Sequence, residues 1–286
     1  MRRRLLFGIG IIAAGCLMLS AARAWWVVGH GTITEAAALA LPDDMPAFFR
    51  AAGKSLAHLA GDPDRWKNRE AAFLRVAEAP HHFLDLEDLD GNEIPRDRFS
   101  GLALMQRLNR PPDKVGLLPW AIMENFDRLM VAFNDYRNDP ANPAITMKCI
   151  VYAGVLAHYT TDAAMPLHTT RNYDGKPGPN GKMLQKGIHA KIDGFPEKNS
   201  FQAEEICRGL EAKKIDDVWD YTVKFILESH THVEKCYELD QGRAFDNPTE
   251  ESRAFIMARC RAGAQYTMNM WYNAWLRSAK LPPPPY

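Results

Sequence analysis

Residues 142–162 read NPAITMKCIVYAGVLAHYTTD, and they decide both the fold class and the centre of the predicted site. The Asn-Pro pair at the start can open a helix, which we expect to run to about Asp162. His158 and Asp162 are four residues apart, so on a helix both side chains point from one face and can bind one ion. His168 follows Pro166, where the helix has ended, and can fold back toward the same centre.

The rest of the chain also favours helices joined by irregular loops. Residues 32–41 are rich in alanine, and residues 117–136 carry apolar side chains at helical spacing. Residues 217–239 favour one further helix. A long helix is expected to end near residue 279, and Asn247 is its predicted cap, with a proline in the first turn and an acid three positions on.

No alternating strand pattern persists along the chain, and there is no internal repeat. Residues 171–186 contain three glycines and two prolines, which predicts a loop. With 286 residues, 47% hydrophobic and 24% charged, the composition is that of an ordinary globular protein, not of a disordered, collagen-like or polytopic membrane protein. We predict a single all-α, multi-helix domain over residues 25–286, with a proline-rich tail at residues 281–286.

Residues 1–24 have the pattern of a signal peptide. Arginines at positions 2–4 precede an apolar run over residues 5–19, and Ala22-Arg23-Ala24 is a typical cleavage site. The apolar run is short for a membrane-spanning helix. We therefore expect cleavage after Ala24, no stable transmembrane anchor, and export as a periplasmic or secreted protein. Cleavage makes Trp25 the new N-terminus.

The mature chain has no basic excess that would attract nucleic acid in general. The whole sequence has 35 basic and 35 acidic residues, and the signal peptide removes four arginines and no acid. Residues 25–286 thus carry 31 basic against 35 acidic side chains, a formal charge of −4. Cys16 offers lipidation as an alternative to cleavage. The remaining cysteines allow two disulfides or four buried free thiols, and they are Cys149, Cys207, Cys236 and Cys260.

A second His-to-Asp pair, His189 and Asp193, repeats the four-residue spacing of the first. One such pair is a weak signal, because a lone pair is usually a salt-bridged surface feature. Two pairs with a third histidine indicate a metal site, and imidazole together with carboxylate suits zinc. Further candidate ligands lie upstream, at His30, Asp62 and His82. Asp64 is an alternative to Asp62, because the proline between them makes the local geometry uncertain.

These residues resemble the superfamily of bacterial zinc-dependent phospholipases C and single-strand-specific zinc nucleases, and most closely the bacterial zinc-dependent phospholipase C family. The superfamily signature is an N-terminal Trp, a His five residues on, then Asp, His, H-x-x-x-D-x-x-x-x-x-H and H-x-x-x-D/E. All of these positions occur here in order, at Trp25, His30, Asp62, His82, His158, Asp162, His168, His189 and Asp193.

The resemblance implies a trinuclear zinc cluster in a cleft of the all-α domain, with Zn²⁺ as the cofactor. It implies that one zinc ion is bound by Asp62, His82, His158 and Asp162, and a second by His168, His189 and Asp193. The third is bound by the free amine and carbonyl of Trp25 and by His30, and Asp162 bridges it to the first. Asp62 is also assigned as the catalytic general base, with a role as ligand alone as the alternative.

Features of both branches of the superfamily are present. The five-residue gap from Trp25 to His30 resembles the nucleases. Asp85 lies three residues after His82, where the nuclease branch places an acid near the substrate base, so we assign Asp85 to substrate binding. Residues 187–193, GIHAKID, resemble the phospholipase segment G-x-H-x-K-x-E, and the R-G-G-N signature of the nucleases is absent.

The pattern predicts an exported zinc-dependent phosphodiester hydrolase that is phospholipase C-like. Clustered dications attract an anionic phosphodiester, and a zinc-bound water can attack its phosphorus in line. The expected substrate is a phospholipid, with single-strand nuclease action on DNA or RNA as the alternative, and no protein partner is implied. A further alternative is a non-catalytic zinc-stabilised binding protein, which the mixed His/Asp ligands disfavour because closed structural sites favour cysteine.

Overall fold

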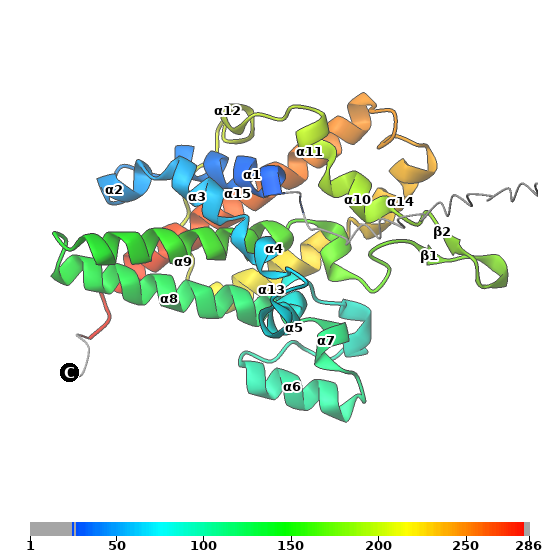
Figure 1. Cartoon of the computed structure of the whole chain (residues 1–286), viewed down its shortest axis with the longest axis horizontal. Helices are drawn as coiled ribbons and strands as arrows, with labels where there is room; N and C mark the ends of the chain where they lie inside the picture. The colour runs from blue at the N-terminus through cyan, green and yellow to red at the C-terminus, as the bar shows by residue number, and fades with distance from the viewer. Residues whose placement is uncertain (1–24, 26, 283–286) are drawn as a thin grey trace, which may run out of the picture.

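The computed structural model describes residue 25 and residues 27–282, and these form an all-α fold with one short β-hairpin (Figure 1). The predicted signal peptide at residues 1–24 and residues 283–286 of the proline-rich tail lie outside the described residues. Among the described helices, none is both long enough and apolar enough to cross a membrane.

The helices follow one another with short connections. The α-helices are α1 (Val27–Leu39), α2 (Ala47–Arg50), α3 (Gly53–Leu59), α4 (Asp62–Trp66), α5 (Ala72–Glu78), α6 (Arg98–Arg107), α7 (Pro112–Val115), α8 (Leu118–Asn138), α9 (Pro143–Asp162), α10 (Ile188–Asp193), α11 (Phe195–Lys198), α12 (Ala203–Ile206), α13 (Val218–His230), α14 (Val233–Gln241) and α15 (Glu250–Ser278). The 3₁₀ helices are η1 (Ala79–His82), η2 (Leu86–Leu89), η3 (Pro166–Thr169) and η4 (Pro179–Gly181). Strands β1 (Lys176–Pro177) and β2 (Met183–Leu184) pair antiparallel.

Three long helices form the centre of the molecule. Helix α8 packs against α9, and α15 packs against both, while α1 contacts α9 and α15 (Figure 1). Phe133 of α8 and Trp271 of α15 are completely buried. The indole of Trp271 also donates a hydrogen bond of 3.0 Å to the carbonyl of Ala153 in α9, so its polar atom is satisfied inside the core. This packing holds α9 firmly, and with it the predicted ligands at its C-terminal end.

The helix predicted over residues 142–162 is confirmed as α9. Asn142 is its N-cap and accepts a hydrogen bond of 3.0 Å from the amide of Ala144, and Pro143 occupies the first turn. After the helix ends, the chain turns at Met165 into η3, which carries His168. The chain therefore does fold back after α9, as the proline at position 166 predicts.

The prediction of helix over residues 217–239 is confirmed, but the stretch forms two helices, α13 and α14. The amides of Thr231 and His232 bond carbonyls only three residues back, at Glu228 and Ser229. Such bonds tighten the last turn and end a helix. The chain therefore changes direction before α14 begins.

The predicted start of the last long helix is also corrected, from Asn247 to Thr249. The Thr249 hydroxyl accepts a hydrogen bond of 3.1 Å from the amide of Ser252, and the Ser252 hydroxyl accepts one of 3.0 Å from the amide of Thr249. This reciprocal capping box satisfies amides at the helix start and so fixes it there.

The loop predicted over residues 171–186 contains the β1–β2 hairpin, whose strands have two residues each. The cysteines of the described residues are free thiols, which agrees with the second of the two alternatives given by the sequence. Cys207 is half-buried and the others are buried.

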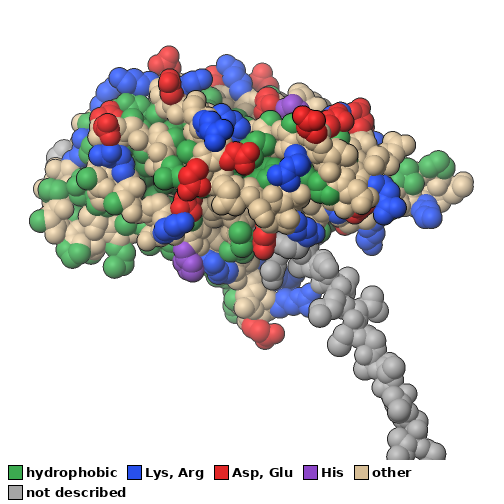
Figure 2. Space-filling model, turned by 90° about the horizontal axis from the view of Figure 1, so that it is seen from above, with side chains coloured by type: hydrophobic (Ala, Val, Ile, Leu, Met, Phe, Trp, Pro, Cys, Tyr) green, Lys and Arg blue, Asp and Glu red, His purple; other side chains and the backbone are tan. Residues whose placement is uncertain are grey.

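The charged side chains of opposite sign are mixed on the face seen in Figure 2. Lysines and arginines lie next to aspartates and glutamates over most of that face. The described side chains drawn there therefore do not form the continuous basic surface by which many proteins bind nucleic acid without sequence preference.

Candidate metal centre

Histidine and aspartate side chains from six segments meet at the C-terminal end of α9. Three groups of histidine and aspartate side chains form there, and within each group one ligand atom per residue lies within 4.8 Å of the others. The groups are His82, His158 and Asp162; His168, His189 and Asp193; and His30, Asp64 and His158.

The first group joins His82 of η1 to His158 and Asp162 of α9. The Nδ1 atom of His82 lies 2.9 Å from Nε2 of His158 and 3.0 Å from Oδ2 of Asp162. The same aspartate oxygen is 3.1 Å from Nε2 of His158. Ligands placed tetrahedrally around zinc, at about 2.0–2.1 Å from the ion, are about 3.3 Å from one another. The three atoms thus have close to the spacing that a zinc ion requires.

The second group joins His168 of η3 to His189 and Asp193 of α10. The two Nε2 atoms are 3.1 Å apart, and Nε2 of His189 lies 2.9 Å from Oδ2 of Asp193. Gly187 precedes α10 with a φ of +92°, a left-handed conformation that glycine adopts without strain. The helix therefore starts directly before His189, and the four-residue spacing places both ligands on one helical face.

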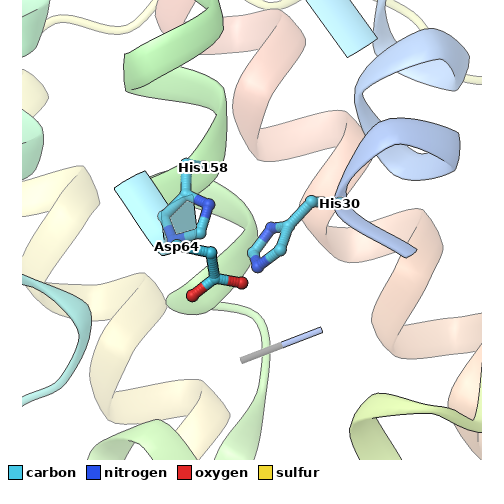
Figure 3. Close-up of side chains that lie close together, drawn as sticks. All are labelled: His30, Asp64 and His158. Atoms are coloured by element: carbon cyan, nitrogen blue, oxygen red, sulfur yellow. The ribbon is translucent and has the colours of Figure 1, made fainter. Parts of the chain in front are cut away.

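The third group brings together His30 of α1, Asp64 of α4 and His158 of α9. Figure 3 shows the three side chains pointing toward one another from these helices. The imidazoles of His30 and His158 are stacked, with ring centroids 4.0 Å apart. His30 Nε2 also lies 3.4 Å from Oδ1 of Asp162, which connects this group to the first.

The structure brings Asp64 into the centre and leaves Asp62 outside it, in the reverse of the assignment made from the resemblance. The side chain of Asp64 is 3% exposed. The carboxylate of Asp62 is 27% exposed and accepts a hydrogen bond of 2.6 Å from Arg65. Both aspartates belong to α4, where residues two apart are about 200° apart around the axis and so face opposite sides.

Hydrogen bonds to backbone carbonyls orient two of the imidazoles. Nδ1 of His158 lies 2.7 Å from the carbonyl of Ala60, and Nδ1 of His168 lies 2.6 Å from the carbonyl of His82. A carbonyl only accepts, so in both rings Nδ1 carries the proton and donates it. In the neutral ring the lone pair is then on Nε2, the atom that faces the other ligands. Burial would lower the pKa of His158, but Asp162 outweighs it and raises that pKa, so a metal ion bound there would displace a proton.

A hydroxyl orients His30 in the same way. Nδ1 of His30 is 2.6 Å from Oγ1 of Thr161, and that hydroxyl donates its own proton to carbonyls of α9, such as that of Ala157 at 2.9 Å. Thr161 can therefore only accept from His30, which leaves Nε2 of the imidazole unprotonated. This atom is the one that faces Asp162.

Trp25 is held against the same end of α9. Its side chain is completely buried, and its indole donates a hydrogen bond of 3.1 Å to the carbonyl of Thr161, the residue before Asp162. Gly29 lies close by, because a Cβ added there would be 3.4 Å from Cβ of Trp25. The first residue of the predicted mature chain is thus placed next to the centre.

Burial lowers the pKa of several imidazoles. Burial, followed by the charge of Lys67, lowers the pKa of His82 to about 4, and burial lowers that of His189 to about 4. Burial, followed by the neighbouring His158, holds the pKa of His30 well below its usual range. These three side chains are therefore neutral at pH 7 and offer nitrogen lone pairs to a metal ion.

The buried aspartates of α9 and α10 are shifted in opposite directions. Burial alone would raise the pKa of Asp162, but His158 and His168 outweigh it and hold the pKa well below its usual range. Burial raises the pKa of Asp193 well above its usual range, although His168 opposes the shift. Asp162 is therefore ionised without a metal ion, whereas burial disfavours the ionised form of Asp193 and a cation beside it would favour that form.

Several buried polar atoms of the centre have no hydrogen-bond partner among the residues that the structure describes, including His30 Nε2, Asp162 Oδ1 and Asp193 Oδ1. Buried polar atoms are almost always partnered, because leaving them unpartnered is costly. A divalent cation that favours mixed imidazole and carboxylate ligands would satisfy them, and zinc is such a cation.

Lys67 is a functional candidate that the sequence analysis did not single out. Its ammonium lies 2.6 Å from Oδ1 of Asp64, and its side chain is 21% exposed. It also lowers the pKa of His82 and of His189, so its charge acts on more than one ligand group. The three-residue spacing from Asp64 was the available signal, since it places both side chains on one face of a helical turn.

Asp85, the predicted substrate-binding residue, belongs to none of the three ligand groups. It is buried, and its amide donates a hydrogen bond of 2.7 Å to the carbonyl of Val115. Burial, followed by the charges of Glu87 and Asp88, raises the pKa of Asp85 to about 8. This side chain is therefore protonated at neutral pH and can donate a hydrogen bond.

The chain matches no protein-family model, and no curated protein matches it in sequence. Among solved structures, its fold is similar to the alpha toxin of Clostridium absonum, with a TM-score of 0.47 and 15% identity over 87% of this chain and 63% of that one. It is also similar to the Clostridium perfringens alpha-toxin from avian strain SWCP, with a TM-score of 0.47 and 14% identity over 89% of this chain and 65% of that one. The chain thus spans less than two thirds of either toxin.

Proposed function

We propose that the protein is a zinc-dependent phosphodiester hydrolase of the phospholipase C type. The observation that carries this proposal is the position of Asp162 between ligand groups. Its Oδ2 lies 3.0 Å from His82 and its Oδ1 lies 3.4 Å from His30. A carboxylate that faces two groups with different oxygens can bridge two cations, and adjacent dications suit the hydrolysis of a phosphodiester.

The ligand sets combine the geometric groups with the order of the sequence motif. Asp64, in place of Asp62, would bind the first zinc ion together with His82, His158 and Asp162. The second would be bound by His168, His189 and Asp193. The third would be bound by His30 and by the backbone amine and carbonyl of Trp25, with Asp162 bridging. Export and cleavage after Ala24 belong to the same proposal, because only cleavage frees the amine of Trp25.

The side chains around the zinc ligands have separable roles. When bound, the zinc ions supply Lewis acidity and lower the pKa of water at the site. Lys67 would attract the anionic phosphate and hold it against the centre. Burial would raise the pKa of Asp64, but His158 and Lys67 outweigh it and lower the pKa to about 2. Such a carboxylate is a poor proton acceptor, so we assign Asp64 to metal binding alone.

Asp85 remains our candidate for substrate binding. With its pKa raised to about 8, it carries a proton at neutral pH. It would therefore donate a hydrogen bond to an acceptor on the substrate, and it would not repel the phosphate as an ionised carboxylate would.

The first experiment is elemental analysis of the processed, Trp25-initiated protein, followed by hydrolysis assays. We expect about three zinc ions per chain, with fewer when extra residues precede Trp25. We also expect release of a phosphorylated head group from a soluble short-chain phosphatidylcholine. Release of nucleotides from single-stranded DNA in its place would establish the nuclease alternative. Bound zinc without hydrolysis of either substrate would establish the non-catalytic alternative, and one zinc ion or none would refute the ligand assignment.

A further inference from the structure

Helix α5 is almost entirely exposed and yet largely apolar. Each residue from position 71 to position 77 is exposed, and the sequence of this stretch is AAFLRVA. Phe73 is 96% exposed, Val76 is 73% exposed and Leu74 is 43% exposed. Phe73 has the largest exposed fraction of the large hydrophobic side chains that the structure describes. Contiguous exposed apolar side chains of this kind mark a surface that binds something.

The helix is fixed to the metal centre at its C-terminal end. Its last residue, Glu78, is buried and accepts a hydrogen bond from the hydroxyl of Tyr159 in α9. The Glu78 carboxylate also lies 3.6 Å from Nε2 of His82. In the sequence α5 lies between Asp64 and His82, and in the fold it packs on α4 and η1, which carry them. Whatever binds to α5 is therefore held next to the proposed zinc ions.

Basic side chains flank the exposed apolar residues of α5 on a chain that is acidic overall. Arg69 precedes them and Arg75 lies between them, with Glu70 as the one acid among residues 65–77, whereas Arg65 and Lys67 are paired with Asp62 and Asp64. The mature chain carries −4. Exposed apolar side chains flanked by arginine and lysine are typical of helices that lie in the interface of an anionic membrane.

We infer that α5, with the basic residues that precede it, docks the metal centre on an anionic phospholipid bilayer. This inference rests on the proposed function and names its substrate as lipid within a membrane surface. Phe73, Leu74 and Val76 would enter the boundary between head groups and acyl chains, and Arg69 and Arg75 would contact lipid phosphates. Single-stranded nucleic acid is disfavoured, since its bases would stack on Phe73 but would gain little from Leu74 or Val76.

The test uses vesicles of phosphatidylcholine with and without phosphatidylserine, and the processed, zinc-loaded protein. The Phe73→Ser/Val76→Ser variant should bind vesicles at least about tenfold more weakly than the wild type, because two large apolar contacts are lost. Its hydrolysis of a soluble short-chain phosphatidylcholine should stay unchanged. The matched control is Val131→Ser/Met147→Ser, which removes exposed apolar side chains from α8 and α9 and should bind vesicles like the wild type.

A second variant, Arg69→Glu/Arg75→Glu, tests the charge and gives an independent result if the first variant does not fold. It should weaken binding to vesicles that contain phosphatidylserine by more than about tenfold and change binding to phosphatidylcholine alone much less. Equal vesicle binding by the wild type and both variants overturns the inference. Variants that bind single-stranded DNA more weakly than the wild type but bind vesicles equally well overturn it in favour of a nucleic-acid surface. If α5-dependent vesicle binding persists and no soluble phosphodiester is hydrolysed, the inference stands and the proposed function fails.

Discussion

The metal centre and helix α5 are neighbours in the fold, but they differ in how many contacts determine each side chain. His158 is completely buried, and its ring is fixed by a backbone carbonyl on one side and by other ligands on the other. Phe73 is 96% exposed and no described contact fixes it. A ligand must be positioned before the metal ion arrives, whereas a membrane-binding side chain needs only to be presented.

The burial of His158 and the exposure of Phe73 each suit the chemistry that the side chain would perform. The ligand groups leave buried polar atoms without hydrogen-bond partners among the described residues, as Asp193 Oδ1 shows. Helix α5 keeps apolar area in water that could have been packed in the core. Both regions are thus incomplete within the described chain, the first toward a cation and the second toward an apolar surface.

The largest expected effect follows from Asp162→Asn, which removes the charge shared by two ligand groups. We expect zinc content to fall by more than one ion per chain and phosphodiester hydrolysis to fall by at least about 1000-fold, because the bridging charge supports more than one cation. Elemental analysis and hydrolysis of a soluble phosphodiester measure both. Asp113→Asn, at an exposed position on α7, is the control and should change neither. An active Asp162→Asn variant with full zinc content would contradict the ligand assignment.

The next effect separates Asp64 from Asp62 by a matched pair of variants. Asp64→Asn should lower hydrolysis by about 100-fold and weaken zinc binding, since it removes a ligand carboxylate. Asp62→Asn should change hydrolysis less than about threefold, because Asp62 pairs with Arg65 at the surface. Zinc affinity, measured by competition with a chelator, shows whether the loss arises at the metal. The opposite ranking of the two variants would restore the original assignment from the sequence.

This pair of residues also shows what the sequence can and cannot predict. The helix that carries His158 and Asp162 is predictable because its cap, its apolar residues and its four-residue spacing are local features. The choice between Asp62 and Asp64 depends on where α4 begins and which of its faces meets α9, and both depend on tertiary packing. The sequence motif therefore predicts the set of ligand types and leaves one position open.

The other differences from prediction also arise where tertiary packing, and no local pattern, decides the structure. The break between α13 and α14 occurs at Thr231, in a stretch that contains neither glycine nor proline, so no strong local signal marks it. The exposure of α5 is equally hidden in the sequence, since a short run of alanine, phenylalanine, leucine and valine resembles a buried helix. Lys67 is notable only once Asp64 is known to face the centre. Local patterns predicted most of the helices. Contacts between the helices determined the break at Thr231, the exposure of α5 and the position of Lys67.

A smaller effect is expected from Lys67, which lies between α4 and α5 and contacts Asp64 of the metal centre. Lys67→Met keeps most of the aliphatic chain and removes the charge, so we expect hydrolysis to fall by about tenfold while zinc content stays unchanged. The loss should be smaller at high salt, where the attraction between a partly exposed cation and a phosphate is screened. Lys67→Arg restores the charge and should recover part of the activity. Arginine can also pair with Asp64, so the unchanged zinc content of Lys67→Met is the result that separates phosphate binding from support of the Asp64 ligand.

The smallest expected effect concerns Asp85. The charged neighbours of this buried carboxyl are mainly acids, which raise its pKa, whereas the neighbours of Asp162 are histidines, which lower its pKa. The folded-state pKa of Asp85 is raised to about 8, above its unfolded value of about 3.9. Its contribution to stability is therefore fully present below about pH 4 and is lost as the pH rises toward 8. Relative to the wild type, Asp85→Asn should gain at least about 1 kcal/mol in unfolding free energy between pH 5 and pH 8, because asparagine does not ionise.

Urea unfolding of both proteins at the two pH values measures this difference, with Asp113→Asn as the exposed control. Zinc content must be equal in all samples, since metal binding itself depends on pH. If the difference between wild type and Asp85→Asn does not change with pH, Asp85 is ionised in the folded protein. It would then repel a phosphate, which would remove the basis for assigning it to substrate binding and would leave Lys67 as the remaining side chain with that role.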